Sequence, residues 1–305
     1  MSDAAASTAP PVGTPTPVGP HARLAILGAG VMGETVLSGL LRAGWSPDDI
    51  VATHRRAERA AHLTHAYGIR MRTNAEAAAE ADTVILVVKP QDMRDLLSEI
   101  SGVVKPDVLI VSLAAGVDTA SIESQLPDGT AVIRVMPNTP AQVDEGMSAI
   151  SGGSHSGADD LAHVTEILSA TGRVVTVPER YQDAVTAISG SGPAYLFYVV
   201  EAMIEAGVHL GLPRNTATEL VVQTMLGSAK LLRETGEHPT VLREQVTSPG
   251  GTTAAAVRQL EDRAVRAAFM TAMEAARDRS RELAAAARVP VPPSPHRSPA
   301  AGERA

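Results

Sequence analysis

Short apolar runs alternate with amphipathic stretches between about residue 21 and residue 177. This alternation predicts an α/β fold, with a parallel sheet covered by helices. The run at Thr83–Val88 is unbroken, as is typical of a strand buried on both faces. Besides a strand just before Gly28, we expect strands at Asp49–Thr53, Ile69–Thr73, Thr83–Val88, Val108–Leu113 and Ala131–Val135, and closing strands at Met147–Ile150 and Arg173–Val177 around a helix near 158–170.

After Pro178 the pattern becomes wholly helical. We expect helices at Tyr181–Ile188, Ala194–Leu210, Pro213–Thr235, Thr252–Glu261 and Arg263–Ala287, with Gly236 as a helix stop. Several of them, such as the segment 220–232, are apolar around most of their circumference. One small helical domain cannot cover that much apolar surface, so we expect an obligate homodimer at least.

Three glycines follow the first strand in the spacing GxGxxG, and a helix with one apolar side comes next. In a dinucleotide-binding turn Gly28 would make the tight bend, Gly30 would let the pyrophosphate approach the backbone, and Gly33 would let helix and strand pack closely. The position between a strand and a helix favours this function over a structural turn. Val31 and Met32, inside the motif, are expected in the same cofactor site.

The second strand ends in Thr53, His54, Arg55 and Arg56, where an NAD-preferring site usually carries an acidic residue. A carboxylate would repel a 2′-phosphate, whereas a hydroxyl and two guanidinium groups would bind it. The sequence therefore favours NADP, with NAD as the second possibility. In the alternative interpretation, Arg55 and Arg56 are only the solvated start of the next helix.

Ligands of open α/β sheets collect beyond the carboxyl ends of the strands. Lys89 at such a tip is otherwise a solvated lysine, and Asn74 is either a ligand of the adenosine ribose or a helix cap. From the strand tips, the residues expected near the cofactor are Asn74, Val88, Lys89, Pro90, Ala114, Ala115, Gly116 and Asn138.

Two further stretches have the composition of helix starts that could receive an anion. In the first, Gly190 and Gly192 would leave backbone N–H groups uncovered before an apolar helix, and in the second Thr252 and Thr253 stand at the mouth of an Ala-rich helix. Either alone is equally a simple cap, but two such ends meeting at one pocket would make a carboxylate site. The expected substrate-binding residues are Ser189, Ser191, Gly192, Pro193, Pro249, Gly250, Gly251 and Thr252.

Composition narrows the possible partners. The 305 residues suffice for about two domains, and the net charge of −8 with no basic stripe argues against nucleic-acid binding. No apolar run is long enough to predict a membrane span, and no signal peptide is recognisable. The chain has no cysteine, which excludes disulfides and cysteine-zinc sites and fits the reducing cytoplasm. We expect no metal in the site.

Together these patterns predict a Rossmann-type NAD(P)-binding domain at 21–177 and an all-helical dimerisation and substrate domain at 178–287. The Ala- and Pro-rich ends, 1–20 and 288–305, are expected to be disordered extensions.

The motifs GAGVMG, VVKP, RVMPNTP, DAVTAISGSGPAY and VTSPGGTT, in this order, closely resemble pyrroline-5-carboxylate reductase, the last enzyme of proline synthesis. The resemblance covers about Leu24 to Leu283 and implies NADPH- or NADH-dependent reduction of 1-pyrroline-5-carboxylate to L-proline. It also implies an intertwined dimer, often assembled further into a decamer. By the same resemblance, Thr253 is the catalytic residue and hydrogen-bonds the substrate nitrogen, and the loop 249–252 helps to hold the carboxylate.

The resemblance also implies cofactor contacts for Val88, Lys89 and Ala115, and a ribose contact for Asn74. Gln245 departs from it, because some members carry asparagine there, touching the cofactor. An imine reductase or a β-hydroxyacid dehydrogenase is the enzymatic alternative, and a non-catalytic NADP-binding protein is the other. The dehydrogenases place a catalytic lysine on the helix after the linker, and the segment 194–206 contains none.

Overall fold

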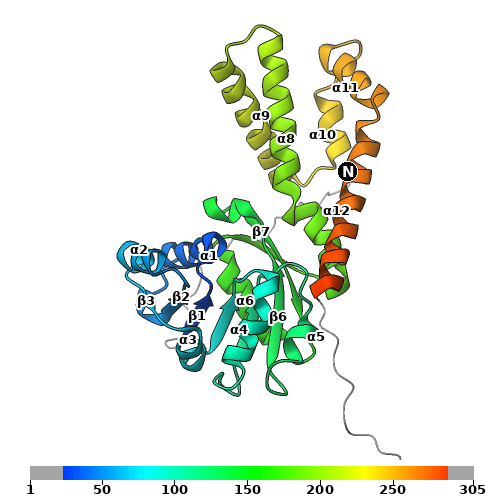
Figure 1. Cartoon of the computed structure of the whole chain (residues 1–305). Helices are drawn as coiled ribbons and strands as arrows, with labels where there is room; N and C mark the ends of the chain where they lie inside the picture. Colours follow the sequence, from blue (N-terminus) through cyan, green and yellow to red (C-terminus); the bar gives the residue numbers. More distant parts are fainter. Residues whose placement is uncertain (1–22, 288–305) are drawn as a thin grey trace, which may run out of the picture.

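The structure, a computed structural model, describes residues 23–287. The two extensions expected at 1–20 and 288–305 lie outside these described residues. Figure 1 shows a sheet covered by helices, with a group of long helices rising from one side of it. Among residues 23–287, every helix is too short or too polar to span a lipid bilayer. The expected α/β region followed by a helical region is confirmed.

Within the described range, eight strands form one sheet in the order β3-β2-β1-β4-β5-β6-β7-β8. All neighbouring strands run parallel except β6 and β7, which are antiparallel. The sheet is therefore parallel, as expected, except at this one pair. The strands are β1 (Leu24–Leu27), β2 (Ile50–Thr53), β3 (Arg70–Met71), β4 (Thr83–Leu86), β5 (Leu109–Ser112), β6 (Ala131–Met136), β7 (Gly146–Gly152) and β8 (Gly172–Thr176).

Each face of the sheet has its own apolar core. On β1, Leu24 and Ile26 pack with helices α1, α2 and α6, whereas Ala25 and Leu27 pack with α3, α4 and α5. Successive strand residues point to opposite faces, so a strand covered on both sides has to be apolar throughout. The covering helices are α1 (Val31–Arg42), α2 (Ala57–Tyr67), α3 (Asn74–Glu80), α4 (Met93–Ile100), α5 (Thr119–Glu123) and α6 (Ala158–Ser169).

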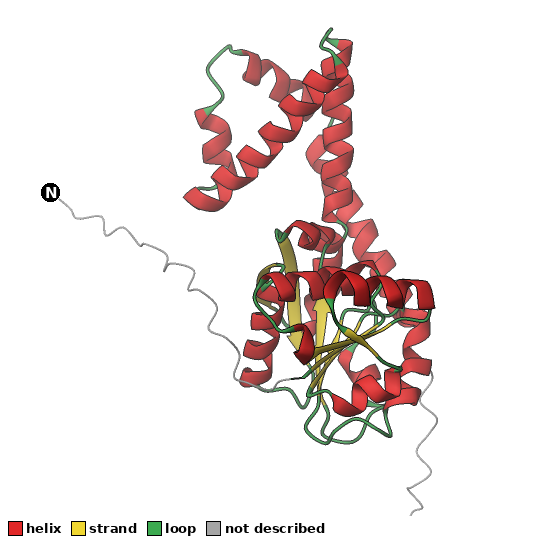
Figure 2. Ribbon diagram, turned by 90° about the vertical axis from the view of Figure 1, so that its left-hand side faces the viewer, coloured by secondary structure: helices red, strands yellow, loops and turns green. Residues whose placement is uncertain are grey.

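The helical part consists of two arms that diverge in Figure 1. In one arm α8 packs against α9, and in the other α11 packs against α12, which returns to the sheet and contacts α7. Figure 2, turned by 90°, shows the same long helices standing clear of the sheet. The helices are α7 (Gln182–Val185), α8 (Gly192–His209), α9 (Arg214–Thr235), α10 (Pro239–Gln245), α11 (Thr252–Asp262) and α12 (Val265–Ala287).

The arms leave much apolar surface uncovered within the chain. On α8 the side chains of Phe197 and Tyr198 are 67% and 74% exposed. Other large apolar residues that are exposed on α8, α9 and α12 are Leu196, Met203, Leu220, Val222, Leu226, Leu231, Phe269 and Met270. Such an extent of exposed apolar surface is typical of a protein interface.

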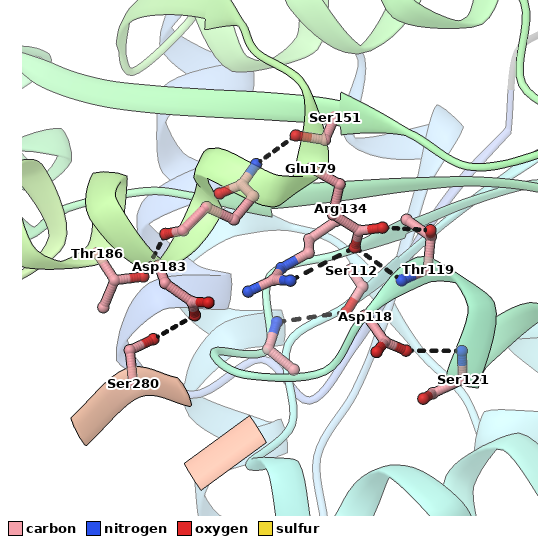
Figure 3. A network of polar contacts seen from close by, with 12 residues as sticks. Ser112, Asp118, Thr119, Ser121, Arg134, Ser151, Glu179, Asp183, Thr186 and Ser280 are labelled. Atoms are coloured by element: carbon pink, nitrogen blue, oxygen red, sulfur yellow. Dashed lines mark hydrogen bonds and ion pairs between the residues drawn. The ribbon is translucent and has the colours of Figure 1, made fainter. Parts of the chain in front are cut away.

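Polar contacts fasten the root of the helical part to the sheet (Figure 3). Glu179, in the short 3-10 helix Glu179–Tyr181, accepts hydrogen bonds from the backbone N–H of Thr119 at 2.8 Å and from its hydroxyl at 2.7 Å. Gln182 is fully buried, and its Nε2 donates to the Ala149 carbonyl and to the Ser151 hydroxyl. Specific polar contacts therefore hold the helical part against the sheet.

Candidate functional site

A cavity of about 580 Å³ opens at the carboxyl ends of β1, β2 and β4. Strand β4 ends at Leu86, two residues earlier than expected, so Val87 and Val88 turn into the cavity wall. The cavity is lined by Gly28, Gly30, Thr53, His54, Arg55, Arg72, Thr73, Asn74, Val87, Val88, Lys89, Asp92, Asp95, Leu96 and Glu99. A crevice beyond the carboxyl ends of strands is where open α/β sheets bind their ligands.

The three glycines fit a dinucleotide. Gly28 has φ +93°, and a Cβ there would meet the Val87 carbonyl oxygen at 2.8 Å. A Cβ on Gly33 would meet the Gly28 carbonyl oxygen at 2.9 Å, because α1 packs directly on the turn. A Cβ on Gly30 would meet nothing within 4 Å, so the backbone faces open space there. These are the bend, the close packing and the access that a pyrophosphate at a helix N-terminus needs.

A chain of hydrogen bonds connects the glycine turn with Asn74. The Gly28 N–H donates to the Thr53 hydroxyl at 3.1 Å, and this hydroxyl donates to Asn74 Oδ1 at 2.7 Å. Asn74 Nδ2 donates to Glu99 at 2.8 Å. Thr53 is 4% exposed, and its hydroxyl already makes two hydrogen bonds within the chain, so its expected contact with a 2′-phosphate stays a prediction. It holds Asn74 at the cavity wall.

Asn74 is not the cap of helix α3. Thr73 is the N-cap of α3, and it forms a reciprocal capping box with Glu76. Asn74 is therefore a cavity residue and not the cap. The hydrogen bonds from the Thr73 backbone and side chain lower the pKa of the Glu76 carboxyl below its usual value.

The two arginines after β2 have different places. Arg55 lines the cavity and lies 3.5 Å from Asp92, measured from Nη2 to Oδ2. Arg56 is the N-cap of α2 and is not part of the cavity lining. Of the two arginines expected at the cofactor site, Arg55 lines the cavity and Arg56 does not. The structure adds His54, Arg72 and Thr73, for which the sequence alone offered no signal beyond their position at strand ends.

A second cavity of about 570 Å³ lies between the strand tips, the π-helical turn Thr186–Gly190 and α12. It joins predicted cofactor and substrate residues in one place. Its lining consists of Pro90, Gln91, Ala115, Gly116, Thr186, Ser191, Ala276, Arg279, Ser280 and Leu283. The four α12 residues could not be expected from the sequence, because only the folded chain brings α12 back to the sheet.

Other predicted cofactor residues are buried or engaged near these cavities. Ala114 is buried in the core, and Met32 packs on the core beneath α1, whereas Val31 is exposed at the start of that helix. Asn138 donates through Nδ2 to the Ser189 carbonyl and hydroxyl, both at 3.3 Å, and accepts the Met147 N–H at 2.8 Å. Its amide joins the end of β6 to the π-helical turn.

The glycine-rich stretch before α8 differs from the expected turn. Helix α7, the π-helical turn and α8 follow one another almost without interruption. The N–H of Ser191, which lies between the two glycines expected to leave their N–H groups uncovered, donates to the Thr186 carbonyl at 2.8 Å. Pro193 is buried, whereas a Cβ on Gly192 would meet nothing within 4 Å. The open side at Gly192 keeps room for a ligand.

The second predicted helix start lies elsewhere in the chain. Gly250 has φ +68°, and with Pro249 and Gly251 it forms the turn into α11, which begins at Thr252 and contains Thr253. Figure 1 places α11 at the outer end of the helical part, whereas α8 begins beside the sheet. Gln245 ends α10 in the same outer arm. The two helix starts expected to share a pocket are therefore separated within one chain.

Comparisons with known proteins cover both parts of the structure. The family model for pyrroline-5-carboxylate reductase dimerisation matches residues 179–283, and the model for coenzyme F420-dependent NADP oxidoreductase matches residues 23–116. Pyrroline-5-carboxylate reductase of Corynebacterium melassecola is 47% identical over 264 residues, which cover 85% of this chain and 98% of that protein. The enzyme of Methanosarcina acetivorans is 43% identical over 263 residues, with 86% and 97% covered.

Solved structures agree with these matches. The pyrroline-5-carboxylate reductase of Coxiella burnetii superposes with a TM-score of 0.82 at 35% identity and covers 86% of this chain and 98% of its own. The Plasmodium falciparum pyrroline carboxylate reductase, solved with NADP bound, has a TM-score of 0.78 at 28% identity, with the same shares covered.

Proposed function

The chain belongs to the pyrroline-5-carboxylate reductase family, and we propose on that premise that it reduces 1-pyrroline-5-carboxylate to L-proline with NADPH. The observation that carries the proposal is the 47% identity to the Corynebacterium melassecola enzyme along 98% of that protein. The cavity at the strand tips supports it independently, because its glycine turn fits a dinucleotide. In a cell this reaction is the last step of proline biosynthesis.

The reaction needs little acid–base chemistry from the protein. Reduction of a C=N bond takes a hydride on carbon and a proton on nitrogen, and an imine protonates readily enough near neutral pH. The bound nicotinamide supplies the hydride. The chain's task is positional: Asn74 and the glycine turn would hold the dinucleotide, and the second cavity would hold the cyclic imine. A hydroxyl that orients the substrate nitrogen completes the site.

We assign that hydroxyl to Thr253, contributed by a second copy of the chain. Within one chain α11 lies away from the start of α8, which borders the second cavity through Ser191. A two-fold dimer that covers the exposed apolar faces can bring α11 of one copy to the α8 start of the other. The substrate carboxylate would then meet the Pro249–Thr252 turn, as the sequence predicts.

The dimer itself is supported by the exposed apolar side chains on α8 and α9 and by the match to a dimerisation family model at 179–283. Assembly of dimers into a decamer and a cytoplasmic location remain proposals. Light scattering tests the assembly: the mass of a decamer is expected, the mass of a single dimer would contradict the decamer, and the mass of a monomer would contradict the dimer as well. Cell fractionation tests the location.

A β-hydroxyacid dehydrogenase is the principal rival, because it has a similar plan of domains. Helix α8, GPAYLFYVVEAMIEAGVH, carries no lysine for that chemistry. The decisive experiment follows NADPH oxidation with 1-pyrroline-5-carboxylate, compared with NADH and with β-hydroxyacids in the reverse direction. Turnover of the imine is expected. Oxidation of hydroxyacids by a protein that leaves the imine unreduced would replace this proposal with the rival.

Thr253→Ala tests the role of the hydroxyl, with Thr165→Ala on α6 as the matched control. The loss of kcat/KM for Thr253→Ala is expected to exceed about tenfold, since the substrate nitrogen loses its partner. A loss of less than about twofold would remove Thr253 from the mechanism while leaving the activity in place.

A further inference from the structure

We propose that Arg72, together with Arg55, forms the site for the 2′-phosphate of NADP, and that Arg56 takes no part in it. This inference rests on the proposed use of NADPH and deepens it by naming a residue that determines cofactor specificity. Arg55 comes from the end of β2 and Arg72 from the end of the neighbouring strand β3.

The pairing of β2 with β3 puts Arg72 at the right place. The two strands are parallel, with Val51 opposite Arg70 and Ala52 opposite Met71. The Arg72 N–H donates to the Ala52 carbonyl at 3.0 Å, which continues the ladder by one step. Arg72 therefore stands beside Thr53, at the strand tip where a dinucleotide-binding fold holds the adenosine ribose. Its side chain lines the same cavity as His54 and Arg55.

Contacts with Glu80 and with the Met71 carbonyl position the guanidinium of Arg72 in the cavity wall. Its Nε lies 3.6 Å from Glu80 Oε1, and its Nη1 donates to the Met71 carbonyl at 3.3 Å. Glu80 is shared, because Arg23 and Arg70 also lie within 3.6 Å and 3.5 Å of it. A carboxylate divided among three arginines neutralises each of them only in part.

Charge divides the cavity into two walls. Arg55 and Arg72, together with His54, lie on the wall formed by the ends of β2 and β3. The wall formed by α4 and the turn before it carries one cation, Lys89, and three carboxylates, those of Asp92, Asp95 and Glu99, and Asp92 lies 3.5 Å from Arg55. A phosphate dianion is attracted to the first wall and repelled by the second. Planar guanidinium groups bind phosphate oxygens in pairs, so two arginines from adjacent strands can clamp one phosphate.

The two other residues expected to bind the 2′-phosphate, Thr53 and Arg56, are less suitable. The Thr53 hydroxyl donates to Asn74 and accepts from Gly28. Arg56 stands at the N-cap of α2, outside the cavity lining. Lys89 also lines the cavity, but it lies in the turn before α4 and not on the strand next to β2. The positive partner of Arg55 is therefore Arg72, seventeen residues along the chain, and not the arginine next to it in sequence.

The test measures the dissociation constants of NADPH and NADH by titration without substrate, for the wild type, Arg72→Gln, Arg55→Gln and Arg56→Gln. Arg72→Gln and Arg55→Gln should each weaken NADPH binding roughly tenfold to a hundredfold, as expected for a lost charged hydrogen bond, and change NADH binding less than about twofold. Arg56→Gln is the matched control and should leave both cofactors within about twofold.

NADH binding serves as the internal check on folding, because a damaged cavity weakens both cofactors. Equal weakening of NADPH and NADH by Arg72→Gln, no effect on either, or a loss with Arg56→Gln as large as with Arg72→Gln would overturn the inference. The two hypotheses can fail separately. If the variants show the expected changes in NADPH binding but the wild-type protein does not reduce the imine, the phosphate site is supported and the proposed function is contradicted.

Discussion

Arg134, buried on β6, lies with its guanidinium Nη1 3.4 Å from Oε1 of Glu179, the residue that begins the helical part (Figure 3). Glu179 also accepts two hydrogen bonds from Thr119. A charged group in the sheet is thus paired across the junction with the root of the helical part. Because the same root continues into the π-helical turn that lines the second cavity, this pair helps to position the cavity wall.

Glu179→Gln should destabilise the protein by about 2–3 kcal/mol, because it leaves the Arg134 guanidinium without a charged partner. The expected loss is below that for a fully buried pair, since 27% of the Glu179 side chain is exposed. Urea unfolding at fixed protomer concentration measures it. Arg281→Ala, which removes an exposed group 3.9 Å from Asp183, is the control and should cost less than about 0.5 kcal/mol. Equal losses of stability in the two variants would show that the Arg134–Glu179 pair does not stabilise the junction.

Thr53→Val should weaken NADPH and NADH to the same extent, by about two- to tenfold. The substitution keeps the shape and removes the hydroxyl that accepts from Gly28 and orients Asn74. Titration of both cofactors measures the effect, with Thr165→Val on α6 as the control. A loss confined to NADPH would mean that the hydroxyl contacts the 2′-phosphate after all.

Gly30→Ala should affect cofactor binding alone, whereas Gly33→Ala should also affect the stability of the protein. A Cβ at Gly30 meets nothing of the protein within 4 Å, so stability should be unchanged while both cofactors bind weakly. A Cβ at Gly33 meets the Gly28 carbonyl oxygen at 2.9 Å, so Gly33→Ala should also cost about 1–3 kcal/mol of stability. Thermal unfolding and cofactor titration are measured on the same samples. Normal NADPH binding by Gly30→Ala would place the pyrophosphate elsewhere.

Thr73→Ala should destabilise the protein less at acidic pH than at neutral pH. Hydrogen bonds from Thr73 lower the pKa of Glu76, so the stability they supply is present above the ordinary carboxyl pKa and is lost as the pH falls through the lowered value. Unfolding of wild type and variant at neutral pH and below pH ~4 tests this. A difference in stability that does not shrink on acidification would show that the Glu76 charge contributes nothing through the cap.

Local spacing was sufficient to predict the elements and the glycine turn. Gly28, Gly30 and Gly33 lie within six residues, so their roles depend on the adjoining strand and helix alone. Gly236, with φ +64°, ends α9 as expected. The short edge strand β3 and helix α10 carry weak periodic signals, so β3 was predicted too long and α10 was not predicted.

What the sequence could not show depends on pairing between distant segments. Arg72 joins Arg55 only through the β2–β3 register, whereas Arg56 is the neighbour of Arg55 in the sequence. Thr53 is engaged because Asn74 folds back against it. Likewise, the contribution of Ser280 to the second cavity depends on the return of α12 to the sheet.

The most direct test of the account is the amount of L-proline formed per NADPH oxidised, measured chromatographically after incubation of the purified protein with 1-pyrroline-5-carboxylate. The account predicts that proline and oxidised cofactor appear in equal amounts and that both fall together in Thr253→Ala. Absence of proline above the protein-free control, in a sample that binds NADPH normally, would contradict it.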